Sequence, residues 1–214
     1  MNVAVIGANG GIGRELLPRL ADAEHDPIGI VRDESQFDEI RDRGGEPRLG
    51  DLEEEFASAL EGVNAVVFTA GSGGDTDWGK TLLVDLWGAR RSIDACVDHG
   101  IDRFVMISSL NASKPLGEPA AMRPYWVAKR CADDFLEQSP LEATILRPTA
   151  LTDDEGTGRI STAFEYPDER GESIPRADVA GTVVACLENH ETIDETIRLF
   201  GGDVPIETAI RPER

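Results

Sequence analysis

The sequence predicts an α/β fold, a doubly wound parallel sheet with helices on both faces. Three features support this prediction. Short apolar runs alternate with longer amphipathic stretches along most of the chain. Residues 3–6 are apolar throughout, which is typical of a strand buried on both faces. A glycine-rich turn joins this run to the first amphipathic stretch. We expect residues 1–214 to form a single domain.

The expected strands are short runs rich in branched and aromatic residues. Four of them lie near the N-terminus, at residues 3–6, 28–31, 46–49 and 64–70. Three more follow at residues 103–107, 142–146 and 196–200. Pro148 ends the run at 142–146, because proline cannot donate a hydrogen bond to a neighbouring strand.

The stretches between these strands predict six helices, at residues 12–20, 34–43, 53–60, 77–98, 124–138 and 177–188. Gly100 is a C-terminal stop for the fourth helix, and Pro124 suits the first turn of the fifth. Pro18 conflicts with the first helix, so we expect a kink or an early end there. Residues 149–175 are rich in Gly, Thr, Asp and Pro and are expected to form a loop region.

Composition excludes several classes of protein. No apolar run approaches the ~18 residues that span a bilayer. The apolar N-terminal stretch is too short for a signal peptide and lacks a basic region before it. The three cysteines and three histidines are scattered, without metal-ligand spacing. We therefore expect a cytoplasmic protein with reduced cysteines, no bound metal and no membrane partner.

The charge balance is strongly acidic. The chain has 41 acidic and 21 basic residues, for a formal net charge of −20. This balance argues against nucleic-acid binding, because phosphate contacts need a basic face. Only Lys80, Lys114 and Lys129 are lysines. A GC-rich genome would replace Lys by Arg without producing the acid excess, whereas a halophilic protein would show both features, so we favour adaptation to high salt.

The glycine-rich turn has the sequence Gly-Ala-Asn-Gly-Gly-Ile-Gly at residues 7–13. Its first glycine can make the sharp turn, the middle pair lets backbone N–H groups approach a pyrophosphate, and the last allows close packing of helix on sheet. The helix N-terminus adds a partial positive charge. A plain glycine turn is the alternative, but the flanking strand and helix favour dinucleotide binding. The residues expected to bind the cofactor here are Gly7, Asn9, Gly10, Gly11, Ile12 and Gly13.

The end of the second strand bears on the choice of cofactor. A carboxylate there would bind the adenosine ribose and repel a 2′-phosphate. The strand instead runs into Arg32, which can make a forked contact with a 2′-phosphate, and then into Asp33. We favour NADP, with NAD possible if Arg32 is a solvated residue and Asp33 binds the ribose.

Two groups of polar residues suggest chemistry. Tyr125 and Lys129 are four residues apart and therefore share one helix face. A nearby ammonium lowers the pKa of a phenol, which would make Tyr125 a usable acid–base group. Ser108 and Ser109 follow the fifth strand at the carboxyl edge of the sheet, where such folds bind ligands. An interfacial tyrosine, a solvated lysine and turn serines are the structural alternatives.

These residues occur in one order with Asp51, the Thr-Ala-Gly at 69–71 and the Arg-Pro-Thr at 147–149. Together they resemble the short-chain dehydrogenase/reductase superfamily, and within it the atypical NAD(P)H-binding, epimerase-like branch with a Rossmann-like fold. The resemblance implies that Ser109, Tyr125 and Lys129 form the catalytic set, with Lys129 also touching the cofactor. The remaining cofactor contacts that it implies are Asp51, Leu52, Thr69, Ala70, Gly71, Ser108, Pro148 and Thr149.

The resemblance favours an NAD(P)-dependent oxidoreductase or epimerase-like enzyme acting on a small carbonyl or hydroxyl substrate, as a monomer or homodimer. Tyr125 would move the proton of the substrate oxygen. Two alternatives stay open: a regulatory module that binds NADP without turnover, and an NADPH-dependent flavin or tetrapyrrole reductase. Residues 148–214 leave only a minimal C-terminal substrate region, which puts a nucleotide-sugar pocket in doubt. The sequence also leaves open whether Ser108 or Ser109 faces the site.

Overall fold

A computed structural model describes residues 1–74, 76–165 and 171–212 of the chain. The main sheet has nine strands within these residues, and a separate small sheet pairs β7 (Leu151–Thr152) with β9 (Ile174–Pro175). The strands of the main sheet are β1 (Asn2–Ile6), β2 (Asp26–Val31), β3 (Glu46–Leu49), β4 (Ala65–Phe68), β5 (Arg103–Ile107), β6 (Glu142–Pro148), β8 (Arg159–Ala163), β10 (Glu195–Gly201) and β11 (Val204–Pro205).

The strand order of the main sheet is β11-β8-β10-β6-β5-β4-β1-β2-β3. From β10 to β3 every neighbouring pair is parallel, which confirms the predicted α/β class. The order reverses between β1 and β4, and ligands in such sheets bind at the carboxyl ends of the strands flanking this point. The loop prediction for residues 149–175 was wrong in part, because β8 pairs antiparallel with β10 and extends the sheet.

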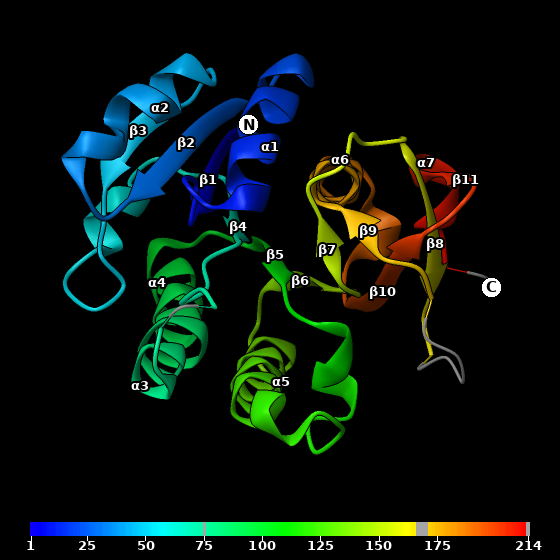
Figure 1. Cartoon of the computed structure of the whole chain (residues 1–214). Coiled ribbons are helices and arrows are strands. Elements are labelled where there is room, and N and C mark those ends of the chain that lie inside the picture. Colours follow the sequence, from blue (N-terminus) through cyan, green and yellow to red (C-terminus); the bar gives the residue numbers. More distant parts are fainter. Residues whose placement is uncertain (75, 166–170, 213–214) are drawn as a thin grey trace.

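Helices cover both faces of the sheet (Figure 1). In the figure α1, α2 and α6 lie on one side, and α3, α4 and α5 lie on the other. The α-helices are α1 (Gly11–Asp22), α2 (Phe37–Asp42), α3 (Trp78–Lys80), α4 (Ala89–His99), α5 (Arg123–Glu137), α6 (Arg176–Glu188) and α7 (Ile206–Ala209). Short 3₁₀ helices are η1 (Glu34–Gln36), η2 (Ala57–Leu60), η4 (Leu110–Ser113), η5 (Ala120–Met122) and η6 (His190–Thr192). A π-helical segment, η3 (Thr81–Gly88), joins α3 to α4, and Gly100 ends α4 in the left-handed conformation.

Pro18 neither shortens nor ends α1, which continues to Asp22. A proline lacks the N–H that would bond the carbonyl four residues earlier, here that of Arg14. The Arg43 guanidinium supplies this bond instead, with Nη1 donating to the Arg14 carbonyl oxygen at 3.0 Å. A partner 29 residues away in sequence therefore makes the proline tolerable.

The helix predicted at 53–60 was wrong over its first half, since only Ala57–Leu60 is helical. The carbonyl oxygens of Leu52 and Glu54 accept hydrogen bonds from Arg91 on α4, at 2.7 and 2.5 Å. The N–H of Glu53 donates to the carboxylate of Asp51 at 2.9 Å. The Arg91 side chain thus takes the carbonyl groups of Leu52 and Glu54, which a helix would have paired internally.

Each face of the sheet has its own apolar core. Val3 and Val5 belong to the core under α1 and α6, whereas Ala4 and Ile6 belong to the core under α4 and α5. This alternation explains why the first strand is apolar throughout. Two of the three free cysteines are buried, one in each core, and burial raises the thiol pKa of each to about 12. Such thiols pack as small apolar groups.

Candidate functional site

The glycine-rich turn packs directly against the end of β4. Gly7 has a φ of 90°, and a Cβ there would lie 2.7 Å from the backbone of Ala70. The N–H of Thr69 donates to the carbonyl oxygen of Ile6 at 2.9 Å. A Cβ on Gly13 would lie 2.5 Å from the carbonyl oxygen of Gly7. The structure therefore brings the turn together with Thr69 and Ala70.

The first turn of α1 is open to a ligand. Gly10 and Gly11 are exposed, and within the described residues no side chain caps this helix end. The side chain of Asn9 is fixed by Arg14, whose Nε and Nη2 donate to Oδ1 at 3.0 and 2.9 Å. Unpaired N–H groups and the helix dipole at this end suit a pyrophosphate, and the absent Cβ atoms leave it room. The residues present thus fit a dinucleotide.

Three further predicted contacts, Arg32, Asp51 and Leu52, follow the ends of β2 and β3. Arg32 is exposed where β2 ends. The carboxylate of Asp33 accepts the N–H of Ser35 at 2.9 Å and caps η1, which lowers the pKa of Asp33. Asp51 caps its own turn, and the side chain of Leu52 is buried against α4 and the π-helical segment. Asp33 is therefore engaged locally, whereas Arg32 faces solvent.

Beneath the carboxyl edge lies a set of four buried charges, Asp85, Lys129, Asp133 and Arg147, which we term the charge cluster. Each of these residues is at most 2% exposed. Nε of Arg147 donates to Oδ2 of Asp133 at 3.0 Å. Two carboxylates balance two cations, so the cluster carries no formal net charge. Buried charges are stable only when they are paired in this way.

Asp85 links the charge cluster to the loop after β4. Its Oδ2 accepts the backbone N–H of Ser72 at 3.0 Å. A Cβ on Gly71 would lie 3.1 Å from Oδ1 of Asp85, so glycine allows this close approach. Asp85 lies in the π-helical segment, and π-helical turns often occur at functional sites. The predicted residue Gly71 is thereby held beside Ala70 and the glycine-rich turn.

Tyr125 lies one turn before Lys129 on α5 and is half-buried. Burial raises the pKa of the Tyr125 phenol, and the carboxylates of Asp85 and Asp133 raise it further. This direction is opposite to the one that the Tyr–Lys spacing suggests. Burial lowers the pKa of Lys129, while the same two carboxylates oppose that shift. Burial and both carboxylates therefore favour the protonated phenol of Tyr125.

The two serines differ in their surroundings. Ser108 is buried, and its hydroxyl donates to Oδ2 of Asp133 at 2.7 Å. Ser109 is half-buried. Because the Ser108 hydroxyl is committed to the charge cluster, Ser109 is the better placed of the two to meet a ligand. Pro148 and Thr149 follow at the end of β6, where the N–H of Thr149 donates to the carbonyl oxygen of Leu199 at 3.0 Å.

The sequence reasoning did not identify Asp85 and Asp133. Each carried a signal. Asp85 is a lone acid within an otherwise apolar stretch, Thr-Leu-Leu-Val-Asp-Leu-Trp-Gly. Asp133 is four residues after Lys129 and eight after Tyr125, so the three residues share a helix face. A buried helix face that carries a Tyr, a Lys and an Asp indicates a functional or paired set more than a packing surface.

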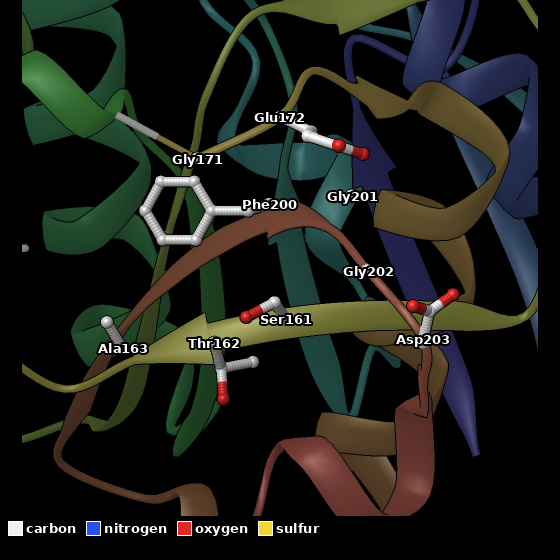
Figure 2. A pocket seen from close by; sticks show the side chains of 9 residues that line it. All are labelled: Ser161, Thr162, Ala163, Gly171, Glu172, Phe200, Gly201, Gly202 and Asp203. Carbon is white, nitrogen blue, oxygen red and sulfur yellow. The ribbon is translucent and has the colours of Figure 1, made fainter. Parts of the chain in front are cut away.

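A separate open cavity of about 470 Å³ lies beside β8 and β10. Figure 2 shows the ring of Phe200 at one end and the carboxylates of Glu172 and Asp203 toward the other. None of the residues predicted from the sequence lines this cavity. Among the described residues no helix is long and apolar enough to cross a membrane, and no group of three or more His, Cys, Asp or Glu side chains could hold a metal ion.

Comparison with known proteins shows the family to which this fold belongs. An "uncharacterized sugar epimerase", YhfK of Bacillus subtilis, is 44% identical over 99% of both chains. A solved Bacillus halodurans structure, provisionally assigned as an NAD-dependent epimerase/dehydratase, superposes with a TM-score of 0.96 at 42% identity over 98% of each chain. The oxidoreductase ylbE from Lactococcus lactis gives a TM-score of 0.86 at 28% identity, covering 98% of this chain and 95% of its own. The family model described as NAD(P)H-binding matches residues 7–190, and the chain belongs to this family.

Proposed function

We propose that the chain is an NAD(P)H-dependent oxidoreductase that acts on a small carbonyl or hydroxyl compound, with Tyr125 as the acid–base group. One observation carries the proposal. Tyr125 is half-buried at the carboxyl edge, near a buried lysine and two buried carboxylates, and burial together with these carboxylates raises the pKa of its phenol. A protonated phenol suits the reductive direction, in which the substrate oxygen must gain a proton.

Each residue has a distinct role in this proposal. The bound nicotinamide supplies or accepts the hydride. Tyr125 donates its proton to the substrate oxygen during reduction and recovers it from the alcohol in the reverse direction. The ammonium of Lys129 stabilises the phenolate left behind and contacts the nicotinamide ribose. Ser109 orients the substrate oxygen, and the turn at residues 7–13 holds the pyrophosphate.

The test begins with a screen for NADPH oxidation across aldehydes, ketones, quinones, flavins and sugar nucleotides, at low and high salt because of the net charge of −20. With a substrate in hand, Tyr125→Phe should keep the fold and the cofactor affinity while turnover falls by about 10²–10⁴-fold. Lys129→Ala should reduce both turnover and cofactor affinity. Turnover by Tyr125→Phe at nearly the wild-type rate would exclude the tyrosine mechanism and favour the flavin or tetrapyrrole reductase. Cofactor binding without any turnover in the screen would favour the regulatory module.

For the cofactor itself we propose NADP. The support comes from Arg32, which is exposed at the end of β2, while the carboxylate of Asp33 is occupied with Ser35. Calorimetry with NADPH and NADH should show tighter binding of NADPH, and Arg32→Ala should remove the difference. Arg41→Ala is the matched control, because Arg41 pairs with Asp38 on α2. An unchanged preference in Arg32→Ala would remove Arg32 from the site.

A further inference from the structure

The side chain of Arg176 crosses the first residue of α1. A Cβ built on Gly11 would lie 2.6 Å from Cδ and 2.8 Å from Nε of Arg176. The missing Cβ of Gly11 therefore leaves room for the Arg176 side chain as well as for a phosphate. Arg176 is the first residue of α6, which packs along α1 (Figure 1). A cation from the far end of the sequence thus stands over the anion-binding end of α1.

The backbone around Arg176 is firmly anchored. Pro175 pairs with Thr152 in the small sheet formed by β7 and β9. The buried carboxylate of Asp178 accepts the N–H groups of Thr157 and Gly158 at 3.0 and 2.8 Å. These contacts fix the start of α6 and leave the long side chain of Arg176 as the part that can move.

The guanidinium of Arg176 already has an anionic partner. Its Nη1 donates to Oδ1 of Asp153 at 2.6 Å. The two sides of this ion pair differ, because the side chain of Asp153 is 89% exposed and that of Arg176 is 28% exposed. Exposed ion pairs contribute little, so a more highly charged anion can displace the carboxylate at small cost.

We propose that Arg176 binds the pyrophosphate of the cofactor, exchanging Asp153 for a phosphate oxygen when the dinucleotide occupies the glycine-rich turn. Arginine forms forked, charge-assisted bonds to phosphate. The helix end supplies only partial charges, and a chain with a net charge of −20 repels an anionic ligand unless a cation lies close to it. Arg176 is such a cation, and the exchange frees the side chain of Asp153 as the cofactor binds, while Asp178 keeps its bonds to Thr157 and Gly158.

Calorimetry with NADPH and with ADP-ribose, which has the pyrophosphate but neither nicotinamide nor 2′-phosphate, tests the assignment without any turnover. Arg176→Ala should weaken both ligands by the same factor, about tenfold to a hundredfold. Arg176→Lys should recover part of the loss and guards against a folding defect in the alanine variant. Arg90→Ala is the matched control, since Arg90 pairs with Asp94 on α4. Unchanged ADP-ribose affinity in Arg176→Ala overturns the proposal, whatever happens to NADPH.

The exchange with Asp153 predicts an effect of opposite sign. Asp153→Asn should tighten ADP-ribose binding about two- to fivefold, because the competing carboxylate is gone. Asp154→Asn removes the same charge one residue further along and should change the affinity less. In the Arg176→Ala background Asp153→Asn should add nothing. If Asp153→Asn and Asp154→Asn raised the affinity for ADP-ribose equally, the gain would come from the lower negative charge of the chain and not from the loss of the Arg176–Asp153 pair. That result would overturn the exchange.

Discussion

Two buried arginines on neighbouring strands show how the two edges of the sheet differ. Arg103 begins β5 at the amino edge, and its guanidinium donates to the carbonyl oxygens of Glu142 and Cys186 and to the hydroxyl of Thr144 at 2.7–2.8 Å. Arg147 lies near the end of β6 at the carboxyl edge, where its main partner is a carboxylate. The charge of Arg103 is stabilised by neutral hydrogen-bond acceptors, whereas that of Arg147 is paired with the carboxylate of Asp133.

The difference in partners has a functional meaning. Among the described residues, Oδ1 of Asp133 and Nη2 of Arg147 are buried without a hydrogen-bond partner, as is Nε2 of His25 at the amino edge, whereas no atom of Arg103 is in this state. Polar atoms that are buried and unsatisfied are costly, and they concentrate where a site serves more than stability. We infer that the amino edge is built for stability, and that the carboxyl edge keeps electrostatic capacity for the site above it.

The largest expected effect is at the amino edge. Arg103→Met keeps an apolar side chain but removes the guanidinium, so the carbonyl groups of Glu142 and Cys186 and the hydroxyl of Thr144 lose this donor. The free energy of unfolding should fall by about 3–5 kcal/mol. Urea denaturation measures this loss, and calorimetry on the folded fraction should show an unchanged cofactor affinity. A loss below about 1 kcal/mol would show that water replaces the guanidinium. It would contradict the inference that Arg103 at the amino edge serves stability.

At the carboxyl edge, Asp133→Asn should cost about 2–3 kcal/mol of unfolding free energy, because it removes a charge from a balanced set while keeping its shape. The double variant Asp133→Leu with Arg147→Met removes one acid and one base together. It should regain most of the lost stability, since Asp85 still balances Lys129. If the double variant is no more stable than Asp133→Asn, charge balance is not what holds the cluster.

Two glycines of the turn should differ when each is changed to alanine. At position 13 the new Cβ would lie 2.5 Å from a backbone carbonyl oxygen, so the turn must shift, at a cost of about 1–3 kcal/mol. At position 11 it meets only the flexible end of Arg176, and alanine favours the helix by up to about 1 kcal/mol. Thermal unfolding of Gly13→Ala and Gly11→Ala compares the two, and equal shifts would contradict this account.

The smallest expected effect concerns His25, which precedes β2 at the amino edge. Burial and the N-terminal ammonium lower its pKa, while Glu188 and Asp26 oppose this shift. The unfolded chain therefore binds more protons than the folded chain in a window just below pH 6.5. Stability should rise with pH across that window and stay reduced below it. Unfolding midpoints between pH 5 and pH 8 should show this slope in the wild type and lose it in His25→Gln.

The sequence predicted most of the sheet because buried strands and glycine stops are local signals. The run at 103–107 became β5 with the same limits, and the glycine-rich turn lies where its flanking elements require. The failures involve distant partners. Nothing near Pro18 indicates that Arg43 completes its helix, and Arg91 holds the segment expected as a helix at 53–60.

The candidate site shows the same division. The spacing of Tyr125 and Lys129 is readable from one helix, but the direction of the phenol pKa is not. That direction comes first from burial, and Asp85, which lies on another element and approaches only when the chain folds, raises the pKa further. The helix expected at 177–188 begins one residue earlier, at Arg176, and the contact of Arg176 with Gly11 appears only in three dimensions.

The bond from Arg43 to the Arg14 carbonyl has a consequence for redesign of the protein. Residues 32–36, which follow β2, are an obvious segment to transplant when altering nucleotide preference. A transplant that stops before α2 leaves the bridge between α1 and α2 intact. A transplant that replaces α2 together with Arg43 removes the donor to the Arg14 carbonyl oxygen, which Pro18 cannot bond. We expect this loss to destabilise α1, the helix whose N-terminus is proposed to bind the pyrophosphate. A segment transplanted to change cofactor preference should therefore end before Arg43, whose guanidinium bonds the Arg14 carbonyl oxygen in α1.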